Sequence, residues 1–116
     1  MLALENLLYI SSVTVFELWW GVYHTSIMRK KTAHIKEDFL KFLSAFVVID
    51  INSELAIEAS TIGVDLQFIG KTIDLHDLYI AATAKFLNVP LITNNIKHFE
   101  AIKDLSIIKW PELLAV

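Results

Sequence analysis

Two observations predict an α/β fold with parallel strands separated by helices. First, the hydrophobic period changes repeatedly along the 116 residues, from short runs of β-forming residues to helical spacing and back. Second, residues 46–51 (Phe-Val-Val-Ile-Asp-Ile) contain a single polar side chain, which is typical of a strand covered on both faces. Because parallel strands require crossover connections, which helices supply, we expect a three-layer α/β/α sandwich around a parallel sheet.

The first half of the chain is expected to form a helix, a strand, two helices and a second strand. Residues 15–31 have a broad apolar pattern with helical spacing, and Phe39, Phe42 and Leu43 share one face of the next helix. The predicted elements are the last turns of a helix over 2–8, a strand over 9–13, helices over 15–31 and 36–46, and a strand over 46–51.

The second half repeats the alternation. A helix is expected to begin at Ser53 and to end before Gly70, because glycine commonly follows the last turn of a helix. The remaining predicted elements are an alanine-rich helix over 75–87, a strand over 89–93, a short helix from Asn95 to Ile102 and a strand over 105–110. With three glycines, two prolines and no linker, residues 1–116 are interpreted as a single domain.

The composition narrows the range of possible functions. Hydrophobic residues make up 55% of the chain and the mean hydropathy is +0.54, so we expect either a sheet buried on both faces or an apolar surface that a partner covers. The absence of cysteine excludes disulfides, thiolate metal sites and a cysteine nucleophile. A net charge of −3 gives no general attraction to nucleic acid, so action on RNA would need a local basic patch or bound metal ions. No apolar run is long enough to span a bilayer and no signal peptide is recognised, which indicates a cytoplasmic protein.

Polar side chains gather where the predicted strands end. They form three groups: Ser12, Thr14 and Glu17 after the first strand, Asp74 and Asp77 at the start of the alanine-rich helix, and Thr93, Asn94 and Asn95 after the third strand. Ligands of open α/β sheets bind at the carboxyl ends of the strands. Mg²⁺ and Mn²⁺ prefer oxygen ligands, and a metal held by carboxylates activates water and stabilises charge on a phosphate.

The same residues also fit a purely structural role. Thr14-x-x-Glu17 matches a capping box, Asp74 and Asn95 lie where N-caps are expected, and Asp77 at the third helical position would favour the helix dipole. Spacing alone favours this capping interpretation. The pair Trp19-Trp20 is interpreted as core or as a dimer surface. Three histidines match no metal motif and are interpreted as surface residues: His24, His34 and His76.

Taken together, three blocks resemble the later motifs of the PIN domain family. They are Ser11 to Leu18 (SSVTVFEL), Asp77 to Ala84 (DLYIAATA) and Leu91 to Phe99 (LITNNIKHF). Their order and spacing match the family over essentially the whole chain. The pattern D-x-x-I-A-A-T-A followed by T-x-N-x-x-x-F is specific, and S-x-x-T-x-x-E-L is less so.

The resemblance implies an endoribonuclease of the VapC toxin type with RNA as substrate, a cognate antitoxin as partner and a homodimeric state. It places Glu17 and Asp77 on conserved acids that bind catalytic Mg²⁺ or Mn²⁺. It also places Thr93 and Asn95 on a polar pair that orders the loop beneath the site, with Thr14 as a further supporting residue. We expect the carboxylates of Glu17 and Asp77 to converge at one end of the sheet.

The chain departs from the family pattern at two places. The family's first strand and its aspartate have no counterpart in these residues, and His98 stands where the family often has an acid, for which Asp74 would compensate in part. Two hypotheses follow: a metal-dependent ribonuclease, or a truncated, inactive PIN-like domain that binds a protein partner. A nucleotide-binding module is disfavoured because no glycine-rich loop follows any predicted strand.

Overall fold

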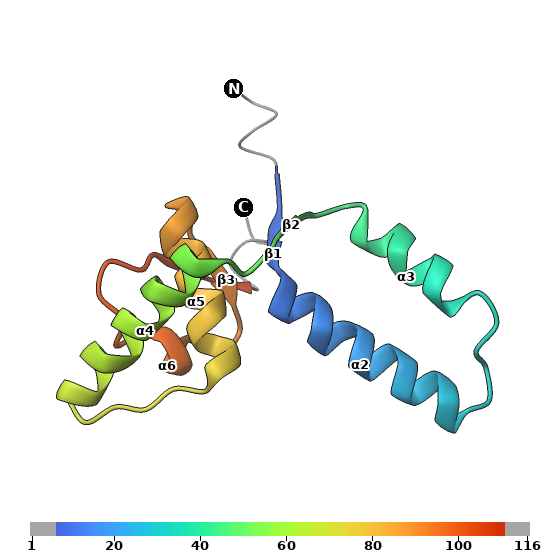
Figure 1. Ribbon diagram of the computed structural model, residues 1–116, viewed down its shortest axis with the longest axis horizontal. Helices are drawn as coiled ribbons and strands as arrows, with labels where there is room; N and C mark the ends of the chain where they lie inside the picture. Colours follow the sequence, from blue (N-terminus) through green and yellow to red (C-terminus); the bar gives the residue numbers. More distant parts are fainter. Residues whose placement is uncertain (1–6, 111–116) are drawn as a thin grey trace. The chain divides into compact units, whose positions relative to one another are not determined.

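The computed structural model describes residues 7–110, and its contacts divide the chain into two compact units, Met1–Asp50 and Ile51–Val116. Figure 1 shows the elements of each unit. The helix expected over 2–8 falls mostly outside the described residues, and Leu7 and Leu8 have no regular secondary structure. The interpretation of the chain as one domain stays a prediction. Within residues 7–110, no helix has both the length and the apolarity needed to cross a membrane.

Over residues 7–50, the first unit contains one parallel strand pair and two helices. Strand β1 (Tyr9–Ser11) pairs in parallel with β2 (Val47–Ile49), with Tyr9 opposite Val47. Helices α2 (Ser12–Met28) and α3 (Ile35–Leu43) form the crossover between the two strands and run in opposite directions, as Figure 1 shows. The predicted parallel strands with a helical crossover are confirmed in this unit.

Helix α2 begins earlier than the sequence predicts. Ser11 has extended backbone angles and its side chain accepts a hydrogen bond from the Val13 amide at 3.2 Å, which makes it the N-cap. The predicted strand extended to the β-branched residue Val13, but a satisfied cap at Ser11 overrides this weak propensity. The strand therefore ends at Ser11 and the helix continues to Met28.

The prediction that the apolar run 46–51 is covered on both faces is wrong. Val47 and Val48 of β2 are 37% and 38% exposed, and Ile49 is half-buried. Helix α2 packs against both strands, but a two-stranded pair offers few neighbours for a second apolar face. An apolar run indicates that a surface favours burial and does not specify what buries it.

The second unit contains the larger core. Helix α4 (Ser53–Phe68) packs against α5 (Leu75–Leu87), and strand β3 (Leu91–Thr93) pairs in parallel with β4 (Ile107–Lys109) across the short helix α6 (Ile96–Phe99). These elements confirm the predicted order, and both described strand pairs are parallel. The buried residues of α4 and α5 are Leu55, Ala59, Ile62, Leu66, Ala81, Ala82, Thr83 and Ala84.

Local hydrogen bonds define both ends of α4. The Asn52 side chain accepts a hydrogen bond from the Leu55 amide at 2.9 Å, which satisfies one of the free amides of the first turn. At the other end Gly70 adopts a φ of +74°, and the amides of Gly70 and Lys71 donate to the Gln67 and Leu66 carbonyls at 3.0 and 2.9 Å. This is the left-handed helix stop that glycine permits, as the sequence predicts.

Candidate functional site

An acid and a histidine meet at the start of α5. The Asp77 carboxylate lies in the first turn of α5, and its Oδ2 is 3.1 Å from Nδ1 of His98 in α6, 21 residues further along the chain. The Asp77 side chain is 21% exposed, whereas that of His98 is 54% exposed. The carboxylate is thus partly withdrawn from water and held from one side by an imidazole that remains open to solvent.

This pair lines a polar pocket of about 260 Å³. The pocket also receives Thr72 and Ile73 from the segment before α5, Asp74, and Lys97. Asp74 and Asp77 bring two negative charges to its wall, and Lys97 brings a positive one. Because α6 follows β3 after two residues, the pocket lies at the carboxyl end of β3, where open α/β sheets bind ligands.

The capping interpretation of Asp74 and Asn95 is correct for their positions in the chain but not for their side chains. Both residues are N-caps, Asp74 of α5 and Asn95 of α6, but within the described part of the chain neither side chain makes a cap hydrogen bond. The Asp74 carbonyl accepts a hydrogen bond from the Leu78 amide at 2.9 Å, so its backbone begins the helix, and the residue also lines the pocket. The Asp77 carboxylate bonds to His98 and is not needed as a cap.

The capping-box interpretation of Thr14 and Glu17 is wrong. Because Ser11 is the N-cap of α2, Thr14 is the third residue of the helix and Glu17 lies in its second turn. Glu17 is exposed and Thr14 is half-buried. Glu17 belongs to the first unit and Asp77 to the second, and the meeting of their carboxylates stays a prediction.

Thr93 shapes the loop between β3 and α6. Its hydroxyl oxygen accepts a hydrogen bond from the Asn95 amide at 3.0 Å, across the turn that leads to His98. This bond fixes the direction in which the chain leaves the strand. The geometry is that expected of the polar pair Thr93 and Asn95, whose role at a site stays a prediction.

The residues of this pocket fit a hydrated divalent ion in part. Asp77 offers carboxylate oxygens and His98 an imidazole, both at the pocket wall. Over residues 7–110 no group of three or more His, Cys, Asp or Glu side chains is arranged to hold a metal. Mg²⁺ usually keeps several waters and needs one or two protein carboxylates, so the pair is compatible with such an ion without enclosing it.

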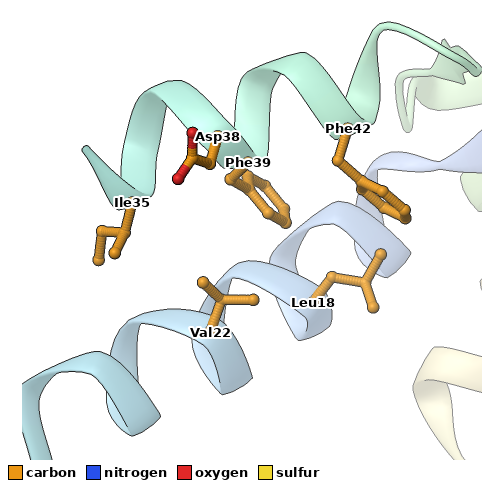
Figure 2. A pocket seen from close by; sticks show the side chains of 6 residues that line it. All are labelled: Leu18, Val22, Ile35, Asp38, Phe39 and Phe42. Carbon is orange, nitrogen blue, oxygen red and sulfur yellow. The ribbon is translucent and has the colours of Figure 1, made fainter. Parts of the chain in front are cut away.

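A second pocket, of about 410 Å³, lies between α2 and α3 in the first unit (Figure 2). Leu18 and Val22 of α2 point toward α3, whose Phe39 and Phe42 point back, and Ile35 and Asp38 complete the lining. This lining is almost wholly apolar, unlike that of the pocket at Asp77. The groove is therefore suited to an apolar protein segment and not to a phosphate.

Of the tryptophan pair, Trp19 belongs to the core of the first unit, and a dimer surface at Trp20 stays a prediction. Trp19 is half-buried, with ring centroids 5.2 Å from Phe39 and 5.4 Å from Tyr23, so it belongs to the packing of the first unit. Trp20 is 65% exposed. The three histidines assigned to the surface, His24, His34 and His76, are all exposed.

Comparisons with known proteins identify the family. The family model described as PIN domain matches residues 2–105. Ribonuclease VapC2 of Rickettsia felis is 34% identical over 112 residues, which cover 97% of this chain and 81% of the relative. Ribonuclease VapC2 of Haemophilus influenzae is 31% identical over 101 residues, covering 87% of this chain and 74% of the relative. The crystal structure of VapBC2 from Rickettsia felis bound to a promoter DNA fragment has a TM-score of 0.76 at 30% identity, covering 91% of this chain and 77% of that chain.

The fold and the site define a chain of the α/β class with a polar pocket at a strand end. The chain belongs to the PIN domain family, and the relatives named above are VapC ribonucleases. The predicted family and fold class are therefore confirmed. Sequence reasoning missed the contact between Asp77 and His98, although it noted that His98 replaces an acid of the family pattern. That substitution is the signal in the sequence that could have pointed to it.

Proposed function

We propose that this protein is a metal-dependent endoribonuclease of the VapC toxin type that cleaves RNA with Mg²⁺ or Mn²⁺ bound at Asp77. Membership of the PIN family and the likeness to VapC ribonucleases support the activity. The observation that carries the site is the partly buried Asp77 carboxylate, held by His98 at the wall of a polar pocket at a strand end. An acidic protein needs such a local site to approach a phosphodiester, since its net charge of −3 gives no attraction to RNA.

The residues have distinct roles in this proposal. Asp77 binds the ion, and Glu17 of α2 and Asp74 supply further negative charge toward it. Thr93 and Asn95 fix the loop that carries His98, and Thr14 supports the turn of α2 that precedes Glu17. When bound, the metal supplies positive charge against the phosphate and makes water a better nucleophile. Lys97, at the pocket wall, is placed to attract the RNA backbone.

The partners in this proposal are a cognate antitoxin and a second copy of the chain, and the protein acts on RNA in the cytoplasm. The solved neighbours include VapBC2 of Rickettsia felis, which supports an antitoxin. The apolar groove between α2 and α3 and the exposed apolar side chains of α2 support protein partners.

The test is RNA cleavage by the purified chain with Mg²⁺ or Mn²⁺, with EDTA as the metal-free reference. We expect cleavage in either metal and none in EDTA. Asp77→Asn should reduce the rate by at least about a hundredfold, because the amide keeps the shape and removes the charge that a hard cation needs. Asp65→Asn, which neutralises an exposed acid of α4, is the matched control and should cleave at the unaltered rate. Equal cleavage by Asp77→Asn and Asp65→Asn would contradict the assignment.

A second candidate function is partner binding without catalysis. Two observations favour it: no group of three metal-ligating side chains was found within residues 7–110, and α2 exposes much apolar surface. The same assay separates the two functions. Absence of cleavage in both metals by a folded chain would leave partner binding as the function.

A further inference from the structure

His98 is the feature of the polar pocket that the proposed function does not use. Its Nδ1 lies 3.1 Å from Oδ2 of Asp77, and its side chain is still 54% exposed. The contact joins α6 to α5 across 21 residues, so tertiary packing and not local sequence holds the imidazole at the pocket wall. The ring is therefore fixed at one edge, while much of its surface stays open to a ligand.

The chemistry of this contact determines what the open edge of the ring can bind. An ionised carboxylate only accepts hydrogen bonds, so Nδ1 of His98 carries the proton and donates to Asp77. Nε2, on the other side of the ring, then accepts a hydrogen bond in the neutral imidazole and donates one in the imidazolium. A hydroxyl group both donates and accepts, so it is a suitable partner for Nε2 in either state.

The preceding residue indicates which kind of molecule carries this hydroxyl. Lys97 comes directly before His98 in α6 and lines the same pocket, where its ammonium group can bind a phosphate. In RNA a 2′-hydroxyl lies on the ribose beside each phosphate, and this group lets a protein distinguish RNA from DNA. Consecutive side chains of α6 thus match neighbouring groups of one RNA strand.

We propose that Nε2 of His98 forms a hydrogen bond with a ribose 2′-hydroxyl at the Asp77 pocket and makes the protein select RNA over DNA. The inference rests on the proposed function, whose substrate it specifies. Hydrolysis of a phosphodiester by water does not consume the 2′-hydroxyl, so this reaction by itself does not distinguish the two nucleic acids. Discrimination then requires a contact with the sugar, and His98 is placed at the pocket wall to make one.

An alternative role for His98 is to hold Asp77 in place without contacting the substrate. Loss of that role would weaken the cleavage of RNA and of its deoxy analogue to the same extent, because both substrates need the same Asp77 carboxylate. Loss of a direct contact with the hydroxyl instead changes the ratio between the two substrates. This ratio separates the two roles even in a variant of reduced activity.

The experiment compares a single-stranded RNA with chimeras of the same sequence in which one ribose at a time is replaced by deoxyribose. Each chimera competes with the RNA for cleavage by the whole chain in Mn²⁺, and the binding of each is measured in EDTA by fluorescence anisotropy. We expect the unaltered chain to disfavour at least one chimera by about three- to tenfold, which is the effect of losing one hydrogen bond.

Two variants of His98 separate the roles of its ring nitrogens. His98→Asn keeps an amide nitrogen near the position of Nδ1, and so a donor for Asp77, but has no atom at the position of Nε2. This variant should accept the disfavoured chimera and the RNA equally well. His98→Gln places a polar group near the position of Nε2 and should keep most of the discrimination.

His76→Asn, which removes an exposed imidazole from α5, is the matched control and should discriminate as the unaltered chain does. Thermal melts establish that each variant is folded. A measurement on the unaltered chain covers the case in which the His98 variants do not fold. Titration with RNA in EDTA should shift the ring signals of His98 in NMR spectra, and the disfavoured chimera should shift them less. Equal shifts with both would overturn the inference.

The outcomes distinguish failure of the inference from failure of the proposed function. If the unaltered chain cleaves RNA but disfavours no chimera, or if His98→Asn keeps the discrimination, the proposed function stands and the inference fails. If the chain binds RNA without cleaving it, the proposed activity fails and the anisotropy ratios decide on the contact. If the chain neither cleaves nor binds RNA, both fail together.

Discussion

The two units differ in how much of their apolar sequence they bury, although both expose large apolar side chains. Of the buried hydrophobic residues among positions 7–110, Phe39 alone belongs to the first unit, and the others lie between Leu55 and Ile102. Helix α2, although rich in apolar residues, has no buried residue within the described range. Helices α4 and α5 instead bury eight residues between them.

Side-chain size explains much of this difference. Three alanines of α5 are buried, and Leu78 lies 3.4 Å from the place where a Cβ would stand on Gly63 of α4, so these helices approach closely. Helix α2 carries Phe16, Trp20 and Met28, which are 56%, 65% and 71% exposed. Small residues let the chain close its own core, whereas large exposed ones indicate a surface that a partner completes.

The largest expected effect is on the core of the second unit. Leu55 is fully buried, so Leu55→Ala should lower the free energy of unfolding by about 2–5 kcal/mol through lost burial and a residual cavity. Leu18→Ala, at a side chain 39% exposed in the first unit, should cost less than about 1.5 kcal/mol. Urea unfolding of both variants measures the difference. Equal losses would show that the first unit has a core as complete as that of the second.

An intermediate effect is expected on association. Trp20→Glu places a charge on the exposed face of α2, where we expect self-association of the chain to depend on apolar contact. The variant should sediment as a smaller species than the unaltered chain, while its free energy of unfolding as a monomer changes by less than about 0.5 kcal/mol. Phe68→Glu, at an 86% exposed side chain of α4, is the control. If both variants reduce association equally, the face of α2 has no special role.

The smallest effect is expected from the same substitution, glycine to alanine, made in one helix of each unit. Alanine in place of a mid-helix glycine stabilises a helix by about 0.5–1 kcal/mol. Gly21→Ala in α2 should give this full gain, because outside the adjacent residues and the local helix backbone nothing lies within 4 Å of the added Cβ. Gly63→Ala should give less, because its Cβ would lie 3.4 Å from Leu78. Thermal melts rank the two, and a larger gain at Gly63 would argue against tight packing of α4 on α5.

The sequence predicts the second unit better than the first. Helix α5 occupies residues 75–87 as predicted, because Asp74 begins it and Asn88, in a left-handed conformation with φ of 55°, ends it. Both signals are local. The start of α2 was misplaced because Ser11 and Thr14 are both competent caps and the chain uses Ser11. The exposure of β2 could not be predicted, because an apolar run does not specify which elements pack against it.

The sequence predicted which acids belong to the candidate site but not the contacts that these acids make. Asp77 stood out by its place in a family motif, but no spacing rule joins it to His98. The bond between them depends on how α6 returns to α5, which is a property of tertiary packing. The three histidines assigned to the surface are exposed as predicted, whereas His98 was noted only as replacing an acid of the family pattern, which does not reveal its bond to Asp77.

Helix α5 carries Asp77 in its first turn and a run of short buried side chains, Ala81 to Ala84, in the turns behind it. Short side chains have few rotamers to lose, and the Thr83 hydroxyl bonds the Tyr79 carbonyl at 2.7 Å, so this run leaves little freedom for adjustment. An added methylene at Ala81 or Ala82 would have to displace the helix axis, and the carboxylate would move with it. A shift of about 1 Å at a reacting centre can cost on the order of a hundredfold in rate. Substitution of residues that do not contact RNA would then lower the cleavage rate. Mutational scans would record these residues as functional positions.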